Sequence, residues 1–169
     1  MNLRITTDMV KALRDETGAG IMDCKTALEA AGGNIDKAKE IIAERGIALA
    51  AKRANRVASQ GLIDVYVHAG GRIGAMVEVN CETDFVARTN EFRQLAHDIA
   101  MQIAAMGPKY IDLDEWPQGE DGLKEEDCLL YQPFIKDPNR TIGDLIRENI
   151  GKTGENIRVR RFARFELGN

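Results

Sequence analysis

The chain offers few side chains that could form or break a covalent bond. It contains a single serine, Ser59, and only two histidines, so a serine–histidine–carboxylate triad has little material and a His-Glu-x-x-His zinc helix cannot be built. The three cysteines (Cys24, Cys81 and Cys128) stand far apart without a Cys-x-x-Cys pair, which indicates reduced thiols and neither a disulfide framework nor a zinc site. We therefore expect no covalent catalysis, no cofactor and no metal.

Two glycine-containing stretches imitate phosphate-binding loops but lack what such loops require. The stretch Gly151-Lys152-Thr153 has Ile146 where a P-loop needs its first glycine, and it joins a helix to a strand, which is the reverse order. The stretch 18–20 (Gly-Ala-Gly) joins two expected helices, whereas a dinucleotide fingerprint joins a strand to a helix. Both stretches are interpreted as turns.

The best candidate for recognition chemistry is the segment 79–86, Val-Asn-Cys-Glu-Thr-Asp-Phe-Val. It ends an alternating strand and then places Phe85 beside Asp84, where a polar turn is usual. Thr83 and Asp84 are turn or helix-cap types, so Phe85 is expected on a short connector between a strand and a helix. On the residue pattern alone, Phe85 is either a core residue tucked under the helix or an exposed probe for a partner.

Length and charge restrict the class of protein. A chain of 169 residues can bury one good core, or one core with a small satellite bundle. The net charge of −4 gives no general attraction to nucleic acid. No apolar run is long enough to span a bilayer, and no signal-peptide core follows residues 1–4. The sequence predicts a cytoplasmic protein that binds neither membranes nor nucleic acid directly.

The hydrophobic pattern predicts an α+β protein in three parts. Residues 1–51 are expected to form a bundle of three short helices, and residues 52–57 a basic linker. Residues 58–169 are expected to form a core with a three-stranded antiparallel sheet packed against helices. The expected helices are 7–16 with Thr7 as N-cap, 22–31, 34–45, 90–105 and 141–150. The expected strands are 61–68, 72–79 and 156–167, with a bulge at 160–162. Residues 112–126 are expected to form an acidic loop that Trp116 holds against the core.

Three long motifs carry a resemblance to a known family. They are residues 13–28 (Leu-Arg-Asp-Glu-Thr-Gly-Ala-Gly-Ile-Met-Asp-Cys-Lys-Thr-Ala-Leu), 80–86 (Asn-Cys-Glu-Thr-Asp-Phe-Val) and 154–162 (Gly-Glu-Asn-Ile-Arg-Val-Arg-Arg-Phe). In this order and spacing the chain closely resembles bacterial elongation factor Ts, over nearly its whole length. The resemblance implies guanine-nucleotide exchange on the GTPase elongation factor Tu, in its GDP-bound or nucleotide-free form, and an N-terminal bundle like the ubiquitin-associated fold.

The resemblance also implies which residues act. A wedge segment enters the partner near its magnesium site, and an anchor set binds the partner's nucleotide-binding domain. The wedge segment is Thr83, Asp84, Phe85 and Val86, and the anchor set is Arg14, Ile21, Met22 and Lys25. From the residues alone, the two apolar members of the anchor set could equally be bundle core, and the two basic members solvated surface.

A single copy of the core unit predicts a homodimer, because long members of the family carry two copies. In that arrangement the His68 turn of one subunit and the Phe85 turn of the other would meet the same GTPase. The long helix is expected to cover the sheet face of Ile63, Val65 and Val67. The other side of the sheet is then the expected interface, with Leu62, Tyr66, Met76 and Phe162.

Two alternatives remain open at this point. An RNA-binding translation accessory factor would use arginines that alternate with Phe162 and Phe165 on the last strand, although edge charges that resist aggregation explain them more simply. These arginines are Arg147, Arg158, Arg160, Arg161 and Arg164. A ubiquitin-associated adaptor would account for the bundle but would leave the core without a purpose.

Overall fold

A computed structural model describes residues 5–115, 117, 122 and 124–169 of the chain. These residues fall into two compact units, Met1–Asn55 with Arg147–Gly154, and Arg56–Ile146 with Glu155–Asn169. The domain limits expected from the sequence, 1–51, 52–57 and 58–169, stay a prediction. Trp116, expected to hold the acidic loop against the core, lies outside the described residues, as do 118–121 and 123.

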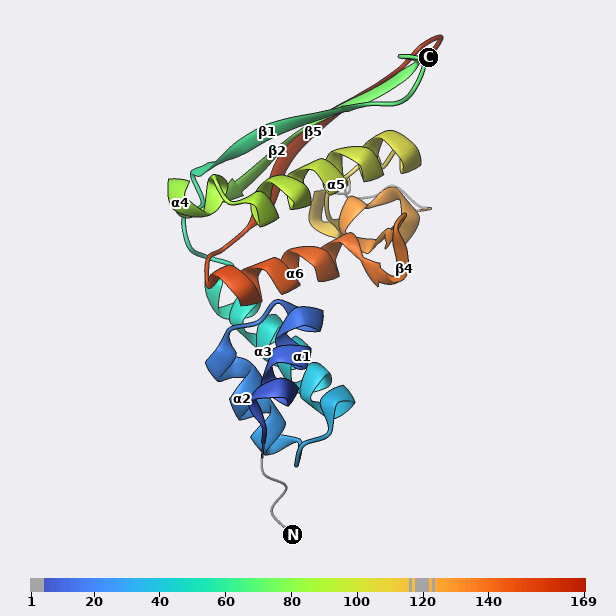
Figure 1. The fold of residues 1–169 in the computed structure, drawn as a ribbon. Coiled ribbons are helices and arrows are strands. Elements are labelled where there is room, and N and C mark those ends of the chain that lie inside the picture. The colour runs from blue at the N-terminus through green and yellow to red at the C-terminus, as the bar shows by residue number, and fades with distance from the viewer. Residues whose placement is uncertain (1–4, 116, 118–121, 123) are drawn as a thin grey trace. The chain divides into compact units, whose positions relative to one another are not determined.

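The first unit contains three consecutive helices, α1 (Thr7–Thr17), α2 (Ile21–Ala30) and α3 (Ile35–Arg53), seen in blue to cyan in Figure 1. The N-cap of α1 is Thr6 and not Thr7, because the Thr6 side chain accepts a hydrogen bond from Met9 N. Gly18 ends this helix in the left-handed conformation, with φ of 67°. The helices bury a shared apolar core that includes Leu13, Cys24, Leu28 and Ala38.

The end of α3 differs from the prediction. The helix was expected to stop near Arg45, but it continues to Arg53 and includes Lys52 and Arg53 of the expected linker. Gly46 interrupts the apolar pattern at this point. The residues after it are mostly alanine, leucine, lysine and arginine, which have high helix propensity, so the helix passes through the glycine.

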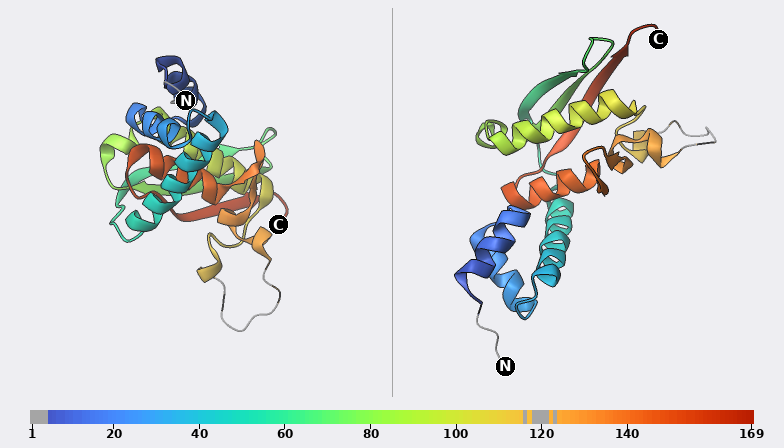
Figure 2. Two further views of the ribbon diagram at one scale, coloured as in Figure 1. Left: turned by 90° about the horizontal axis from the view of Figure 1, so that it is seen from below. Right: turned by 45° about the vertical axis from the view of Figure 1, so that its right-hand side comes forward.

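The second unit is built on an antiparallel sheet in the order β1 (Gln60–Val67), β2 (Ile73–Cys81), β5 (Arg158–Glu166). The long helix α5 (Asn90–Met106) lies along one face of this sheet, as Figures 1 and 2 show. The expected bulge is present, since Glu78 pairs with Arg161 and Val79 with Val159, leaving Arg160 as the extra residue. The predicted α+β class and three-stranded sheet are confirmed.

Smaller elements connect α5 to β5. The helix α6 (Ile142–Thr153) begins with the expected capping box: Asp144 N donates to Thr141 Oγ1 at 3.1 Å, and Thr141 N donates to Asp144 Oδ2 at 2.8 Å. A short hairpin of β3 (Pro133–Phe134) and β4 (Asp137–Thr141), which was not expected from the sequence, precedes this helix. The other connecting elements are η1 (Leu113–Glu115), η2 (Glu125–Asp127) and η3 (Leu129–Tyr131).

The pairing register corrects the expected assignment of sheet faces. Leu62 pairs with Val79 and Tyr66 with Ala75, so even-numbered residues of β1 share a face with odd-numbered residues of β2. This is the helix face, because the Tyr66 ring lies 5.8 Å from the His97 ring of α5. Phe162 pairs with Val77 and lies on this face too. Of the expected interface residues, only Met76 lies on the opposite side.

The opposite side, here called the outer face, carries exposed apolar side chains. Their exposed fractions run from 46% for Met76 to 73% for Phe165. Among the described residues, no helix lies over this face in Figure 1 or in the right-hand view of Figure 2. The apolar members of the outer face are Ile63, Val65, Val67, Met76 and Phe165.

Gly61 controls how closely β1 approaches β2. Its φ is 142°, and a Cβ at this position would lie 2.0 Å from Val79 O. We predict that Gly61→Ala lowers the free energy of unfolding by more than about 3 kcal/mol, because strain and a backbone clash add. Gly70→Ala is the matched control, with φ of 89° and nothing within 4 Å, and should cost about 1 kcal/mol. Urea unfolding of both variants measures the difference; equal losses would contradict the role of the clash.

Candidate partner-binding site

The wedge segment forms a capped turn at the end of β2. Thr83 is the N-cap of the four-residue helix α4 (Asp84–Ala87), and its Oγ1 accepts from Val86 N at 3.4 Å. Asp84 pairs with Arg88 at 2.9 Å across this helix. The Phe85 side chain is 80% exposed, which rules out the core interpretation and leaves a large apolar ring in contact with solvent.

Residues from a distant part of the chain hold this turn. The Glu155 carboxylate accepts hydrogen bonds from Glu82 N at 3.1 Å, Thr83 N at 3.0 Å and Thr83 Oγ1 at 2.6 Å. In return, the Glu82 carboxylate accepts from Asn156 N at 2.7 Å and from Arg56 Nη1 at 3.1 Å. Glu155 and Asn156 lie in the motif 154–162, but the sequence predicts no role for them, because no local pattern indicates a partner more than 70 positions away.

Cys81 is buried beneath the turn, and its thiol donates to Thr83 O at 3.1 Å. Burial, with the nearby Glu155 carboxylate as the second cause, raises the pKa of the Cys81 thiol to about 11. Cys81 therefore stays protonated and unreactive at neutral pH while the turn is closed. The other two cysteines, Cys24 and Cys128, are also buried and free.

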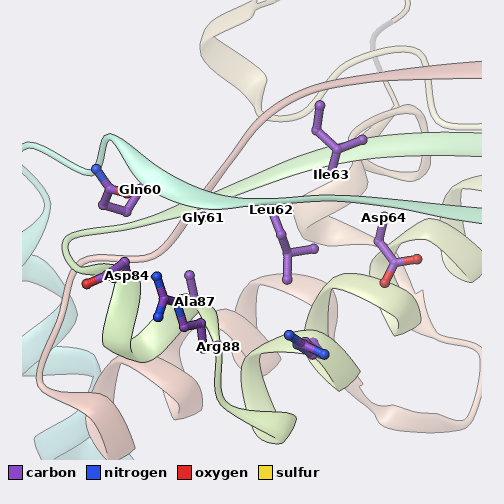
Figure 3. A pocket seen from close by; sticks show the side chains of 9 residues that line it. Gln60, Gly61, Leu62, Ile63, Asp64, Asp84, Ala87 and Arg88 are labelled. Atoms are coloured by element: carbon purple, nitrogen blue, oxygen red, sulfur yellow. Dashed lines mark ion pairs between the residues drawn. The ribbon is translucent and has the colours of Figure 1, made fainter.

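A pocket of about 530 Å³ lies between β1 and the α4–α5 segment (Figure 3). Asp84 of α4, Arg88 at the C-cap of α4 and Asp64 of β1 line its edge. Figure 3 also shows Leu62 and Ile63 pointing to opposite faces of the sheet, as the register requires. The pocket adjoins the wedge segment and mixes both charge signs.

The anchor set lies in the first unit, on α1 and α2. Ile21 and Met22 are 57% and 68% exposed, so they belong to the surface and not to the bundle core. They occupy the first turn of α2, and Lys25 lies in the next turn, at 3.9 Å from Glu29. Arg14 is exposed in the last turn of α1. The structure thus offers an exposed apolar pair on the same helix as a basic side chain.

His68 lies at the other end of the β1–β2 hairpin from the wedge segment. Its backbone forms the turn, with Gly71 N donating to His68 O at 2.9 Å, and its Nδ1 lies 3.1 Å from Tyr66 Oη. The length of β1 separates this turn from Phe85, by roughly 26 Å at about 3.3 Å per residue. Within one chain, therefore, His68 and Phe85 do not form one site.

The C-terminal arginines do not form one continuous surface. Arg161 lies on the outer face, where it donates to Glu78 at 2.7 Å. Arg164 lies on the helix face and donates to Ala104 O and Glu166. Phe162 and Phe165 are likewise divided between the two faces. The alternation that suggested stacking on RNA therefore sends the side chains in opposite directions.

Within the described ranges, no helix is long and apolar enough to cross a membrane. Over the same residues, no group of three or more His, Cys, Asp or Glu side chains could hold a metal ion.

Comparison with known proteins places these features in a family. The family model described as "Elongation factor TS" matches residues 5–120. The chain is 50% identical to elongation factor Ts of Carboxydothermus hydrogenoformans, with 97% of this chain and 89% of the relative covered. It is also 50% identical to elongation factor Ts of Syntrophomonas wolfei, with 97% and 91% covered, and 49% identical to that of Moorella thermoacetica, with 94% and 93% covered. The chain belongs to the elongation factor Ts family of translation elongation factors.

Proposed function

We propose that this chain promotes GDP release from elongation factor Tu, as a nucleotide-exchange factor without covalent chemistry of its own. The observation that supports this most directly is Phe85, an aromatic ring 80% exposed on a capped four-residue helix. A large apolar side chain in this position gains most of its stabilisation when a partner pocket covers it. Membership of the elongation factor Ts family supplies the identity of that partner.

The exchange mechanism requires differential binding. The factor binds nucleotide-free elongation factor Tu more tightly than the GDP form, and by linkage it weakens GDP binding by the same factor. The wedge segment acts near the magnesium site of the partner, with Phe85 intruding between partner side chains and Asp84 beside it. Because magnesium neutralises the diphosphate charge, a small displacement of its surroundings destabilises bound GDP.

The anchor set supplies binding that does not depend on the wedge segment. Ile21 and Met22 form the apolar centre of this contact, while Arg14 and Lys25 provide charge at its border. Their exposure supports the assignment, since interface centres combine apolar and aromatic contact with a polar rim. In kinetic terms, the anchor set lowers the concentration needed for half-maximal exchange and the wedge segment raises the maximal rate.

We also propose that two chains pair through the outer face. Its exposed apolar side chains, including Val65 at 52% and Phe165 at 73% exposed, are neighbours on one sheet face, and grouped exposed apolar side chains mark protein–protein contacts. A twofold partner presents the same surface, so each sheet would cover the other. In such a dimer one GTPase could meet the Phe85 turn of one subunit and the His68 turn of the other.

The first test concerns the wedge segment. Phe85→Ala should leave the melting temperature nearly unchanged, because the ring is exposed, and should lower the maximal rate of GDP release about 30-fold, which corresponds to about 2 kcal/mol. Release of a fluorescent GDP analogue from elongation factor Tu measures the rate. Val57→Ala is the control, since Val57 is 79% exposed in the same unit and should have no effect. No acceleration by the parent protein at micromolar concentration would contradict the proposed function.

The second test concerns the anchor set. Met22→Ala should raise the half-saturating concentration about 10-fold and leave the maximal rate within twofold, because it removes apolar contact made equally before and during exchange. Met106→Ala, at another exposed methionine, is the matched control. Titration of the exchange rate gives both parameters. An unchanged half-saturating concentration would remove Met22 from the anchor set.

The third test concerns dimer formation. Val65→Lys places a charge at the centre of the outer face and should convert a dimer into a monomer of 18.7 kDa. Val57→Lys introduces the same charge at an exposed valine outside the sheet and should leave the dimer intact. Sedimentation equilibrium of the parent and both variants at tens of micromolar protein measures whether each is a monomer or a dimer. A parent protein that is monomeric under these conditions would contradict the dimer.

A further inference from the structure

We infer that Glu155 is the positioning residue of the wedge segment: its carboxylate fixes the Thr83 cap of α4 and through it the direction in which Phe85 points. This inference rests on the proposed function for its consequence in exchange. Its structural part, that Glu155 holds the turn closed, stands on the geometry alone.

The helix α4 is too short to set its own geometry. It has four residues, one turn, and an isolated helix of this length is unstable in water because nucleation costs more than a single turn returns. The exposed Phe85 ring is mostly surrounded by solvent, so the ring does little to hold the helix either. The direction of Phe85 therefore depends on what fixes the first residue of the turn.

Glu155 fixes that residue through charge-assisted hydrogen bonds. One carboxylate oxygen accepts from the backbone N–H groups of Glu82 and Thr83, and the other accepts from the Thr83 hydroxyl at 2.6 Å. The same hydroxyl accepts from Val86 N, which lies beside Phe85. A continuous path of hydrogen bonds thus joins Glu155 to the backbone of the wedge segment.

The contact between the segment of Glu82 and Thr83 and the segment of Glu155 and Asn156 is reciprocal. The two segments are therefore restrained from sliding along each other as well as from separating. Glu82 Oε1 accepts from Asn156 N at 2.7 Å, so each of the two segments places a carboxylate on the backbone N–H of the other. The Asn156 side chain donates to Arg56 O at 2.8 Å, and Arg56 pairs with Glu82. Three chain segments are therefore locked around one turn.

A turn fixed before docking benefits exchange directly. Ordering a loop during binding costs free energy, and a misplacement of about 1 Å can cost on the order of 100-fold in rate. Glu155 removes this ordering cost for the wedge segment only. Its loss should therefore affect the maximal exchange rate and leave the binding supplied by the anchor set unchanged.

The kinetic test compares two changes at Glu155 with a matched change elsewhere. Glu155→Ala should lower the maximal rate of GDP release on the order of 10-fold and keep the half-saturating concentration within about twofold. Glu155→Gln keeps an oxygen that can accept from both N–H groups and should restore most of the rate. Glu166→Ala removes a paired carboxylate at the other end of β5 and should leave both parameters unchanged.

A second readout follows the turn without the GTPase. In a protein with Cys24→Ala and Cys128→Ala, only Cys81 can react with a thiol reagent. With the turn closed, reactivity should rise only as pH approaches the Cys81 pKa of about 11, because the neutral thiol is favoured below it. Adding Glu155→Ala should open the turn and raise the reaction rate at pH 8 at least about 10-fold above that of Glu155→Gln, which removes the same charge from beside Cys81 but keeps hydrogen-bonding atoms. Glu166→Ala should leave the rate at that of the parent.

The outcomes separate the two proposals. Slow exchange with fast Cys81 labelling in Glu155→Ala, both largely restored in Glu155→Gln, supports the inference. Unchanged Cys81 labelling in Glu155→Ala overturns it, whatever the exchange rate, and so does a full maximal rate despite fast labelling. If the parent protein does not release GDP, the proposed function fails, and Cys81 labelling alone then decides whether Glu155 holds the turn. Should Glu155→Ala not fold, Glu155→Gln with normal labelling and a 10-fold lower rate would also overturn the inference.

Discussion

The pairing of β2 with its two neighbours is the constraint on which the second unit depends. As the central strand, β2 is fixed on one edge by β1 and on the other by β5, and this register decides which side chains meet α5. The alternate residues Ala75, Val77 and Val79 are buried beneath the helix. The same register places Met76 and its neighbours on the outer face. One strand register therefore determines both the buried core and the exposed apolar surface.

The pairing of β2 with β1 and β5 also places the candidate site, which begins where β2 ends. Gly61 allows the β1 backbone to lie against Val79, and the chain then turns at Cys81 into α4. The segment that precedes β5 reaches this turn because β5 is paired with β2 along its length. Glu155 is therefore placed beside Thr83 by strand pairing, although 72 positions separate them in sequence.

The two proposed binding surfaces lie in different units and are stabilised in different ways. The anchor set lies on α1 and α2, whose packing around Leu13 and Leu28 gives them a fixed shape. The wedge segment lies on one helical turn that has no core of its own and relies on carboxylate–backbone hydrogen bonds. An exposed aromatic ring on such a turn is costly for a protein that acts alone, and it is consistent with a surface completed by a partner.

The sequence by itself determined the class of fold, most helix starts and the candidate site, because these depend on local signals. Periodicity defined the helices and strands, the Thr141–Asp144 capping box marked the start of α6, and the slip at 160–162 marked the bulge. The motif at 80–86 pointed to Phe85 and carried the family resemblance. In contrast, the length of α3 was underestimated, because a glycine within a helix and a glycine that ends one look the same locally.

Only the tertiary structure decided which sheet face is covered and what holds the wedge segment. Ile63, Val65 and Val67 were expected beneath the helix, yet the hairpin register sends them outward, because a shift of one residue reverses every side chain of a strand. The exposure of Phe85, Ile21 and Met22 depends on which surfaces the folded chain leaves uncovered. The role of Glu155 likewise requires knowing that two distant segments meet, which is a property of strand pairing and not of any local pattern.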